Sequence, residues 1–557
     1  MFHYWLRWAF LVFGLFLAGC PSSENTPSFG GERARRGEPV PAAFDQFERE
    51  VEAGIGDRTS DPLPSFKERL ATLPAALREP ELKRASSVLE SLSRSTSTSD
   101  IAESLLILEY SDFDLPDAQR QLAREILVEE QQSILAELES EPELDLVAQQ
   151  QLFSELLLIS IALGKEEQTE SYEIAVAGLY GVLNETGRFG SQTGGFLESS
   201  SASQRLMGSA LWAASFGDSR LRAHPYFAFA PYWFMHHLQP GDFSYPSHGV
   251  GRVSEAEMRR LIAKELLGLS MLQVSEDIRW WLENFAPNDA DLLRPELYVE
   301  LAGLDLPEDF EPPAPYGIYP DAALVFWRSS WDFEADGLVA IGALIDEEGT
   351  AKEAGHISWL QDGKPVLVEV ADTNEVIDSE GNTVVIPAHN VVRVGDGVPR
   401  ERKAPIITRE LTTEGGNLRI DCSGIFAELG QWHRDLFWTT GGELRIIDNI
   451  AYSLGVRDRT EMFWHLGATE PVEITEDESR TIIEWGSAAV VIQSNVPMEL
   501  RQFMVPSGVE VDGEQQMEVV IAMRTIGRPP SFRVLTRVLH RELGAEAEIL
   551  DDVSQVQ

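Results

Sequence analysis

The spacing of apolar residues changes near residue 310, and this change constrains the fold more than any other feature. From residue 45 to about residue 286 the apolar side chains recur at intervals of three and four, as in "DIAESLLILEYSDF" and "EAEMRRLIAKELLGLSMLQ", which is typical of amphipathic helices. After the proline-rich stretch "GLDLPEDFEPPAPYGIYP" come short β runs such as "PVLVEV", "NVVRV" and "GELRIIDNI". The pattern predicts an α-helical domain over residues 45–310, an antiparallel β-sandwich over residues 311–545 and a C-terminal tail over residues 546–557.

The N-terminus has the composition of an export signal. The stretch "MFHYWLRWAFLVFGLFLAGC" has a basic residue near its start, an apolar run too short for a stable membrane span, and small residues before Cys20. Its "LAGC" ending resembles the lipobox of bacterial lipoproteins, which implies a signal peptide over residues 1–19 and a lipid on Cys20. Residues 20–44, rich in Pro, Gly, Ser and charge, are predicted to form a flexible tether.

The lipobox resemblance also implies a location. A chain anchored in the membrane through the lipid on Cys20 belongs to the bacterial cell envelope and faces the periplasm or the cell surface. Pro21 stands where inner-membrane lipoproteins have Asp, so the outer membrane is the favoured address. Cys422 is the only other cysteine, so lipidation of Cys20 leaves it no partner for an intrachain disulfide.

The charge balance limits the partners. The chain carries 45 Lys and Arg against 91 Asp and Glu, a formal net charge of −46, and nucleic acid is excluded as a partner because binding it needs clustered basic residues. An acidic polysaccharide would be repelled at long range as well. Such a ligand requires a locally basic cleft, for which Arg205, Arg393 and Lys352 are candidates.

Four stretches of the β region, taken in order, resemble the C-terminal domain of heparinase II/III polysaccharide lyases. These are "YPDAALVFWRSSWD", "SWLQDGKPVLVEVADT", "IPAHNVVRVGDGVPR" and "HRDLFWTTGGELRIIDNI" followed by "MFWHLG". The helical half, with "GDSRLRAHPYFAFAPYWFMHHLQPGDFSY", is more loosely similar to the preceding helical toroid of that family. The resemblance implies an α+β multidomain protein in which an N-terminal incomplete (α/α) toroid precedes an antiparallel β-sandwich, with substrate in the groove between them.

The same resemblance implies one structural zinc ion in the sandwich, held by a His-x-His strand, a hairpin carboxylate and the His of an Ala-His-Asn segment. His389 matches the Ala-His-Asn histidine and Glu369 stands at the hairpin carboxylate, and both are zinc ligands by type. The His-x-His pair is absent, and its nearer histidine aligns with Glu353. His356 lies three residues later, an odd shift that would turn its side chain to the other face of a strand unless a bulge or another register intervenes. We expect His356, Glu369 and His389 to bind the metal.

The helical half departs from the family at the catalytic tyrosine. After Glu198 in "GGFLESSSASQR", Ser and Ala occupy the positions around the expected tyrosine. Tyr226, Tyr232 and His237 are the candidate substitutes for proton transfer, although an aromatic stripe at helical spacing more often belongs to a core. His356 is a further catalytic candidate.

Other polar residues have less specific interpretations. Arg205 is the candidate for the substrate carboxylate, with Asn184 as a second group, although residues of these types in a helix are more often exposed or helix caps. The segment "QWHRD" around His433 and Arg434 is interpreted as a sheet edge or a sugar-facing strand.

Two functions follow from these residues. The first is β-elimination in a uronic-acid-containing polysaccharide or oligosaccharide, in which a base removes the C5 proton and an acid protonates the leaving oxygen. The second is a catalytically inactive relative that binds glycan or serves as a structural envelope lipoprotein. The absent His-x-His pair and the absent tyrosine favour the second, and the order of the four matched stretches favours the first.

Overall fold

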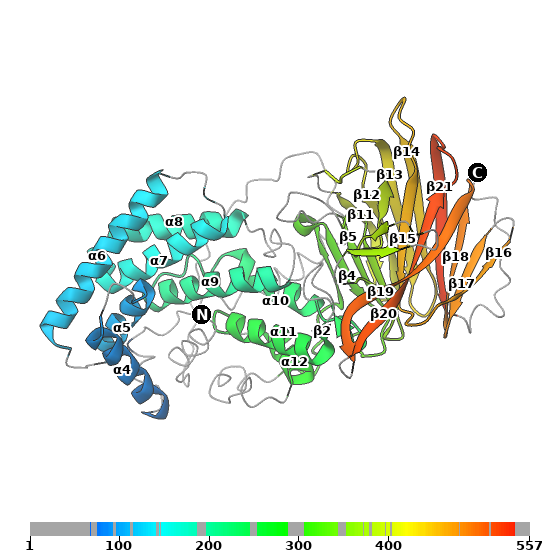
Figure 1. Ribbon diagram of the computed structural model, residues 1–557. Helices are drawn as coiled ribbons and strands as arrows, with labels where there is room; N and C mark the ends of the chain where they lie inside the picture. Colours follow the sequence, from blue (N-terminus) through cyan, green and yellow to red (C-terminus); the bar gives the residue numbers. More distant parts are fainter. Residues whose placement is uncertain are drawn as a thin grey trace.

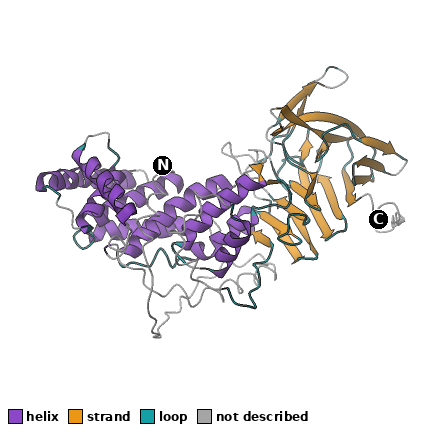
Figure 2. Cartoon of the chain, turned by 90° about the horizontal axis from the view of Figure 1, so that it is seen from below, coloured by secondary structure: helices purple, strands orange, loops and turns teal. Residues whose placement is uncertain are grey.

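The chain folds into a helical part and a strand part that are clearly separated along the molecule, as the computed structural model shows in two views (Figures 1 and 2). The structure describes Lys67 and residues 75–540 apart from 93–95, 112–114, 141–143, 145, 186–195, 245–252, 274, 288–305, 343–352, 371–372, 378–380, 382, 396, 401–403, 478–479 and 512–513. The predicted signal peptide, Cys20, the tether and the tail lie outside the described residues.

The described helices follow one another in the N-terminal half. They are α4 (Ala75–Glu90), α5 (Thr98–Tyr110), α6 (Asp117–Ser140), α7 (Leu146–Gly164), α8 (Thr169–Glu185), α9 (Phe196–Ser215), α10 (Pro225–His236), α11 (Glu255–Ser270) and α12 (Glu276–Phe285). Helix α7 is long and apolar enough to span a membrane, but half of its apolar window is buried in this domain, where it packs against α5, α6, α8 and α9. It is therefore the central helix of the helical part.

The helix boundaries follow from local sequence. Helix α11 begins after Ser254, whose hydroxyl accepts the N–H of Glu257 at 3.2 Å, and acidic residues in its first turn favour the positive end of the helix dipole. Helix α12 begins in the same way after Ser275. Its buried side chains recur at three and four along one face and turn that face to the core: Ile278, Trp281, Leu282 and Phe285.

The strands form two large antiparallel sheets. The first has the order β19-β20-β15-β7-β6-β5-β4-β3, with β10 paired to β15, and the second has the order β11-β12-β13-β14-β21-β18-β17-β16. The first sheet is built from β3 (Tyr316–Tyr319), β4 (Leu324–Arg328), β5 (Gly337–Ile341), β6 (Ile357–Gln361), β7 (Lys364–Leu367), β10 (Val392–Val394), β15 (Thr460–Leu466), β19 (Met498–Val511) and β20 (Glu514–Thr525). The second is built from β11 (Ile406–Thr412), β12 (Gly415–Asp421), β13 (Leu429–Thr439), β14 (Leu444–Tyr452), β16 (Glu473–Glu476), β17 (Thr481–Trp485), β18 (Ala488–Ser494) and β21 (Ser531–His540).

Smaller strand pairs complete the described elements. They are β1 (Phe243–Ser244) with β2 (Val253–Ser254), and β8 (Asn374–Ile377) with β9 (Thr383–Ile386).

The two sheets pack face to face through large aromatic side chains. Trp327 of β4 packs edge-on against Trp438 of β13, with ring centroids 5.8 Å apart, and stacks on Trp359 of β6. Side chains point alternately into the sandwich and away from it along each strand. In β14, for example, every second residue is buried while most of those between are partly exposed. The predicted combination of an α-helical domain with an antiparallel β-sandwich is confirmed.

The two parts meet at the end of α10 and the first strands of the sandwich. Arg328, which is buried, donates to the carbonyl of Leu238 at 2.8 Å and also to the carbonyls of Trp331 and Asp332. The ring of His236 bridges Tyr319 Oη and the carbonyl of Ala314. One buried apolar cluster runs from the helices through this junction into the sandwich. The predicted boundary at residue 310 falls between α12 and β3.

Candidate functional site

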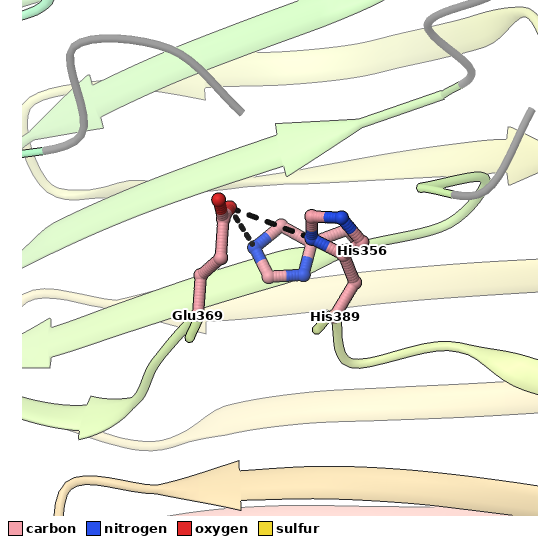
Figure 3. A group of neighbouring side chains, drawn as sticks. All are labelled: His356, Glu369 and His389. Carbon is pink, nitrogen blue, oxygen red and sulfur yellow. Dashed lines mark ion pairs between the residues drawn. The ribbon is translucent and has the colours of Figure 1, made fainter. Parts of the chain in front are cut away.

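Three buried side chains converge inside the first sheet: His356, Glu369 and His389 (Figure 3). His356 directly precedes β6, Glu369 follows β7, and His389 precedes β10. One ligand atom from each lies within 4.8 Å of the others. The structure thus brings together the three residues expected to bind a metal, although they are separated by up to 33 positions along the chain.

The turn before β6 explains how His356 reaches the cluster despite its odd offset from the family pattern. The N–H of His356 donates to the carbonyl of Glu353 at 2.8 Å, and Gly355 has a φ of +80°. A Cβ at Gly355 would lie 3.1 Å from the ring of Trp432 and 3.2 Å from Sγ of Cys422, so both the positive φ and the close contacts favour glycine there. Because His356 lies in the turn rather than in the strand, strand alternation does not govern its direction.

Hydrogen bonds fix the ring of His356. The N–H of Asn390 donates to Nδ1 of His356 at 3.0 Å, so the neutral ring carries its proton on Nε2. That Nε2 lies 3.0 Å from Oγ of Ser358 and 3.5 Å from Oε2 of Glu369. His356 is therefore enclosed within the sheet, and its ring faces the cluster.

His389 lies between two carboxylates. Its Nδ1 is 3.6 Å from Oε2 of Glu369 and its Nε2 is 3.6 Å from Oε1 of Glu353. Burial disfavours the charged imidazole, but Glu369 and Glu353 outweigh burial and raise the pKa of His389. Glu353, at the position of the family's histidine, thus contributes a carboxylate to the edge of the cluster.

The donor set fits a divalent metal such as zinc. Nδ1 of His389 is buried and has no hydrogen-bond partner among the described residues. Tetrahedral zinc at about 2.1 Å from each ligand places neighbouring ligand atoms about 3.4 Å apart. The distances of 3.5 Å and 3.6 Å from Oε2 of Glu369 to the two ring nitrogens are close to that value. Two imidazoles and one carboxylate are also a common zinc ligand set.

Asn390 connects the cluster to its surroundings, and sequence reasoning assigned it no role. Its side-chain amide donates to the carbonyls of Ile357 and Val368, both at 2.8 Å, and its Oδ1 accepts the N–H of His465 at 2.6 Å. His465 is buried, and burial together with the charge of His389 lowers its pKa to about 3. The Ala-His-Asn segment was the available signal, because it placed Asn390 directly after His389.

A pocket opens beside the cluster. His389 and Arg393 lie on its wall together with apolar side chains such as Phe426 and Trp432. Arg393 is paired with Glu461 across β10 and β15. The pocket gives a route by which a metal ion could reach His389.

The catalytic candidates of the helical part lie in α9, in α10 and, for His237, directly after α10. Tyr226 and His237 are buried, at 1% and 2% exposure, and the ring of His237 packs against Trp233 and Phe326. Tyr232 is partly exposed and its hydroxyl bonds Asp277. Arg205 is partly exposed and donates to Oε1 of Gln150 at 3.1 Å.

The remaining polar residues predicted from the sequence lie at several different places in the structure. Asn184 is exposed, and its Oδ1 lies 3.2 Å from Nε2 of His224. The "QWHRD" segment lies in β13, which pairs with β12 on one side and β14 on the other. The sheet-edge interpretation of that segment is therefore wrong. The side chains of Glu198 and Lys352 lie outside the described residues.

Comparisons with known proteins support the fold. No protein-family model and no curated protein matches the chain. A solved heparinase III with methylated lysines is 11% identical, with 98% of this chain and 85% of that chain covered and a TM-score of 0.53. A mutant of the heparan sulfate lyase HepC from Pedobacter heparinus is also 11% identical, with 97% and 83% covered and a TM-score of 0.53. The chain therefore has the fold of heparinase III-type polysaccharide lyases, a helical toroid followed by a β-sandwich.

Proposed function

We propose that the protein is a polysaccharide lyase that cleaves a uronic-acid-containing acidic polysaccharide or oligosaccharide by β-elimination. The observation that carries the proposal is the extent of the structural likeness, since nearly the whole chain superposes on a heparinase III and on a heparan sulfate lyase. The four stretches of the sandwich that resemble heparinase II/III sequences support it independently.

We assign chemistry to the two candidates that are partly exposed, Tyr232 and Arg205. Burial, followed by the charge of Asp277, raises the pKa of Tyr232 well above its usual value. The raised pKa keeps this phenol protonated, so Tyr232 can donate a proton to the leaving glycosidic oxygen, as a weaker acid than free tyrosine, and a separate base must remove the C5 proton. The guanidinium of Arg205 is suited to stabilising the uronate carboxylate as charge develops on it.

We also propose that His356, Glu369 and His389 hold one zinc ion. Nδ1 of His389 is buried without a hydrogen bond and lies 3.6 Å from Oε2 of Glu369, and this position together with the spacing of the ligand atoms supports the assignment. Such an ion would neutralise Glu369 and cross-link three segments of the first sheet. Because His356 is enclosed in that cluster, we assign it to the metal and not to proton transfer with substrate.

An inactive relative that binds glycan, or that has a structural role in the envelope, is the second candidate. It is favoured by the burial of Tyr226 and His237, which removes two of the four helical candidates from contact with a glycan. This alternative predicts glycan binding without cleavage, or no glycan binding at all. A single assay for cleavage therefore distinguishes the two functions.

The assay is ultraviolet absorbance of the unsaturated uronate product, with protein lacking residues 1–20 incubated with alginate, heparan sulfate, chondroitin, hyaluronan and ulvan. We expect new absorbance on at least one glycan, lost in Tyr232→Phe and retained in Tyr180→Phe, a control at an exposed tyrosine of α8. Binding without new absorbance on any glycan would support the inactive relative instead.

We propose further that Cys20 carries the lipid that anchors the protein in the cell envelope, with the outer membrane favoured. The "LAGC" ending and the Pro at position 21 support this location. Mass spectrometry of the N-terminal peptide should show a diacylglyceryl group on Cys20, and Cys20→Ser should release the protein from the membrane fraction. A membrane-bound Cys20→Ser variant would contradict the anchor.

A further inference from the structure

A charged pair lies in the interior of the sandwich, between the two sheets. Arg434 of β13 and Asp448 of β14 are directly opposed in the ladder, and both side chains are fully buried, at 0% exposure each. Nε and a terminal nitrogen of Arg434 donate to the two carboxylate oxygens of Asp448 at 2.8 Å and 3.1 Å. Trp432 donates its indole N–H to Oδ1 of Asp448 at 2.9 Å, and the ring of Trp464 lies 5.0 Å from the guanidinium carbon.

Such a pair does not stabilise a fold simply by being buried. Taking two charges out of water costs several kcal/mol per ion, and an apolar pair of similar volume often serves as well. Every second residue of β13 around Arg434 is a large apolar side chain facing the same interior: Trp432, Leu436 and Trp438. The charged pair therefore calls for an explanation beyond packing.

The remaining nitrogen of Arg434, Nη1, bonds two backbone segments next to the candidate metal site. Nη1 donates to the carbonyl of Gly355 at 2.6 Å and to the carbonyl of Asn390 at 2.8 Å. Gly355 immediately precedes His356 in the chain, and Asn390 immediately follows His389. One nitrogen from the second sheet thus connects the turn that carries one ligand with the segment that carries another.

The shape of the guanidinium allows it to bind the Asp448 carboxylate and the two backbone carbonyls at the same time. Its planar fork binds the carboxylate through two nitrogens while the third points elsewhere, and it stays charged when buried. The ammonium of a lysine has three donors around one nitrogen and does not reach all four of these acceptor oxygens.

We propose that Arg434, oriented by Asp448, is a positioning residue that sets the relative placement of His356 and His389 and so tunes the affinity of the cluster for a divalent cation. The metal-affinity part of this inference rests on the proposed zinc site. Residues that orient metal ligands from outside typically change metal affinity by about 10-fold to 100-fold when they are mutated. The positioning itself does not depend on a metal being present.

The test compares Arg434→Lys with a matched control, Arg419→Lys. Arg419 also forms a bidentate pair, with Asp435 at 2.7 Å and 2.9 Å, on the neighbouring strand β12, but its side chain is 30% exposed. Zinc affinity is measured by competition with a chromophoric chelator, and the geometry of the site is followed in the visible spectrum of the cobalt(II)-loaded protein. We expect Arg434→Lys to lose about 10-fold or more in zinc affinity and to change the cobalt spectrum, while Arg419→Lys changes neither.

A second measurement reads positioning without metal. Hydrogen exchange of the His356 and Asn390 amides, which bond Glu353 and the ring of His356, should accelerate in metal-free Arg434→Lys and not in the control. If the wild-type protein binds neither zinc nor cobalt, the metal site is overturned and this exchange result decides the positioning role. Unchanged exchange in a folded Arg434→Lys protein would overturn that role. If Arg434→Lys does not fold, Asp448→Asn, which keeps an acceptor for Trp432, takes its place with the same two outcomes.

Discussion

At the scale of single residues, the candidate site consists of three side chains that the sequence predicted to lie together, His356, Glu369 and His389, in a geometry that it did not predict. His389 and Glu369 match the family spacing, whereas the offset of His356 from that spacing would turn its side chain to the opposite face of a regular strand. The turn from Glu353 to His356 removes that conflict. Hydrogen bonds from Asn390 and Arg434 could not be foreseen, because they depend on the register between strands far apart in the chain.

Gly355→Ala tests the turn. An alanine at a φ of +80°, with its Cβ 3.1 Å from Trp432, is strained in both backbone and contact, and we expect the free energy of unfolding to fall by about 1–3 kcal/mol. Gly455→Ala is the control, since Gly455 has a similar φ of +82° with nothing within 4 Å, and should cost only about 1 kcal/mol. Equal losses in urea denaturation would contradict the close contact at Gly355.

The protonation of the cluster predicts how zinc binding depends on pH. A proton on Nε2 of His356, and the proton that His389 retains because Glu369 and Glu353 raise its pKa, must both leave when these nitrogens bind a metal. We therefore expect zinc affinity to rise from mildly acidic to mildly alkaline pH, with protons released in calorimetry in buffers of different ionisation enthalpy. A pH-independent affinity would argue against these nitrogens as ligands.

At the scale of elements, apolar periodicity predicted the helices and strands. It did not predict which polar residues within those elements are buried. In β13 the alternation places Arg434 among inward-facing apolar residues, whereas the sequence segment that carries it was interpreted as a sheet edge or a sugar-facing strand. In α11, Glu265 belongs to the same class, since it is 1% exposed within an amphipathic helix. Buried charges of this kind are fixed by partners on other elements, which periodicity does not report.

Glu265 predicts a pH dependence of stability. Burial raises its pKa to about 7, against hydrogen bonds from Ser200 and Gln204 that lower it. Because the folded-state pKa exceeds the unfolded value of 4.5, the folded protein binds the proton more tightly, and its stability falls as pH rises from about 4.5 to 7, by roughly 3 kcal/mol in total.

Glu265→Gln removes the titrating group and should flatten this pH dependence. The control Glu257→Gln, at a half-exposed position of the same helix, should leave it unchanged. Unfolding in urea at several pH values measures both, and a slope that survives in Glu265→Gln would show that other groups dominate.

At the scale of the whole molecule, the two-part architecture and its likeness to heparinases could be predicted from the change in periodicity and from the four ordered stretches. The placement of the helical candidates could not, because the burial of His237, for example, depends on how the end of α10 packs against Phe326 of the sandwich. Helical spacing states which side chains share a face, and tertiary packing decides whether that face meets solvent or another domain.

The net charge of −46 predicts that association with sulfated glycans depends on ionic strength. Long-range repulsion slows the approach of a polyanion and is screened by salt. We expect the association rate with heparan sulfate, measured by surface plasmon resonance, to increase as ionic strength is raised. An association rate that decreases with salt would reveal a locally basic groove that overrides the overall charge.

The central claim is that His356, Glu369 and His389 form a metal centre in a lyase-type sandwich. The most direct measurement is the metal content of the full-length purified protein by inductively coupled plasma mass spectrometry, before and after dialysis against zinc. We predict about one zinc per chain, since one ion satisfies the three ligands, and its loss in Glu369→Gln with the fold retained. A wild-type protein that carries no zinc and takes up none on dialysis would contradict the claim.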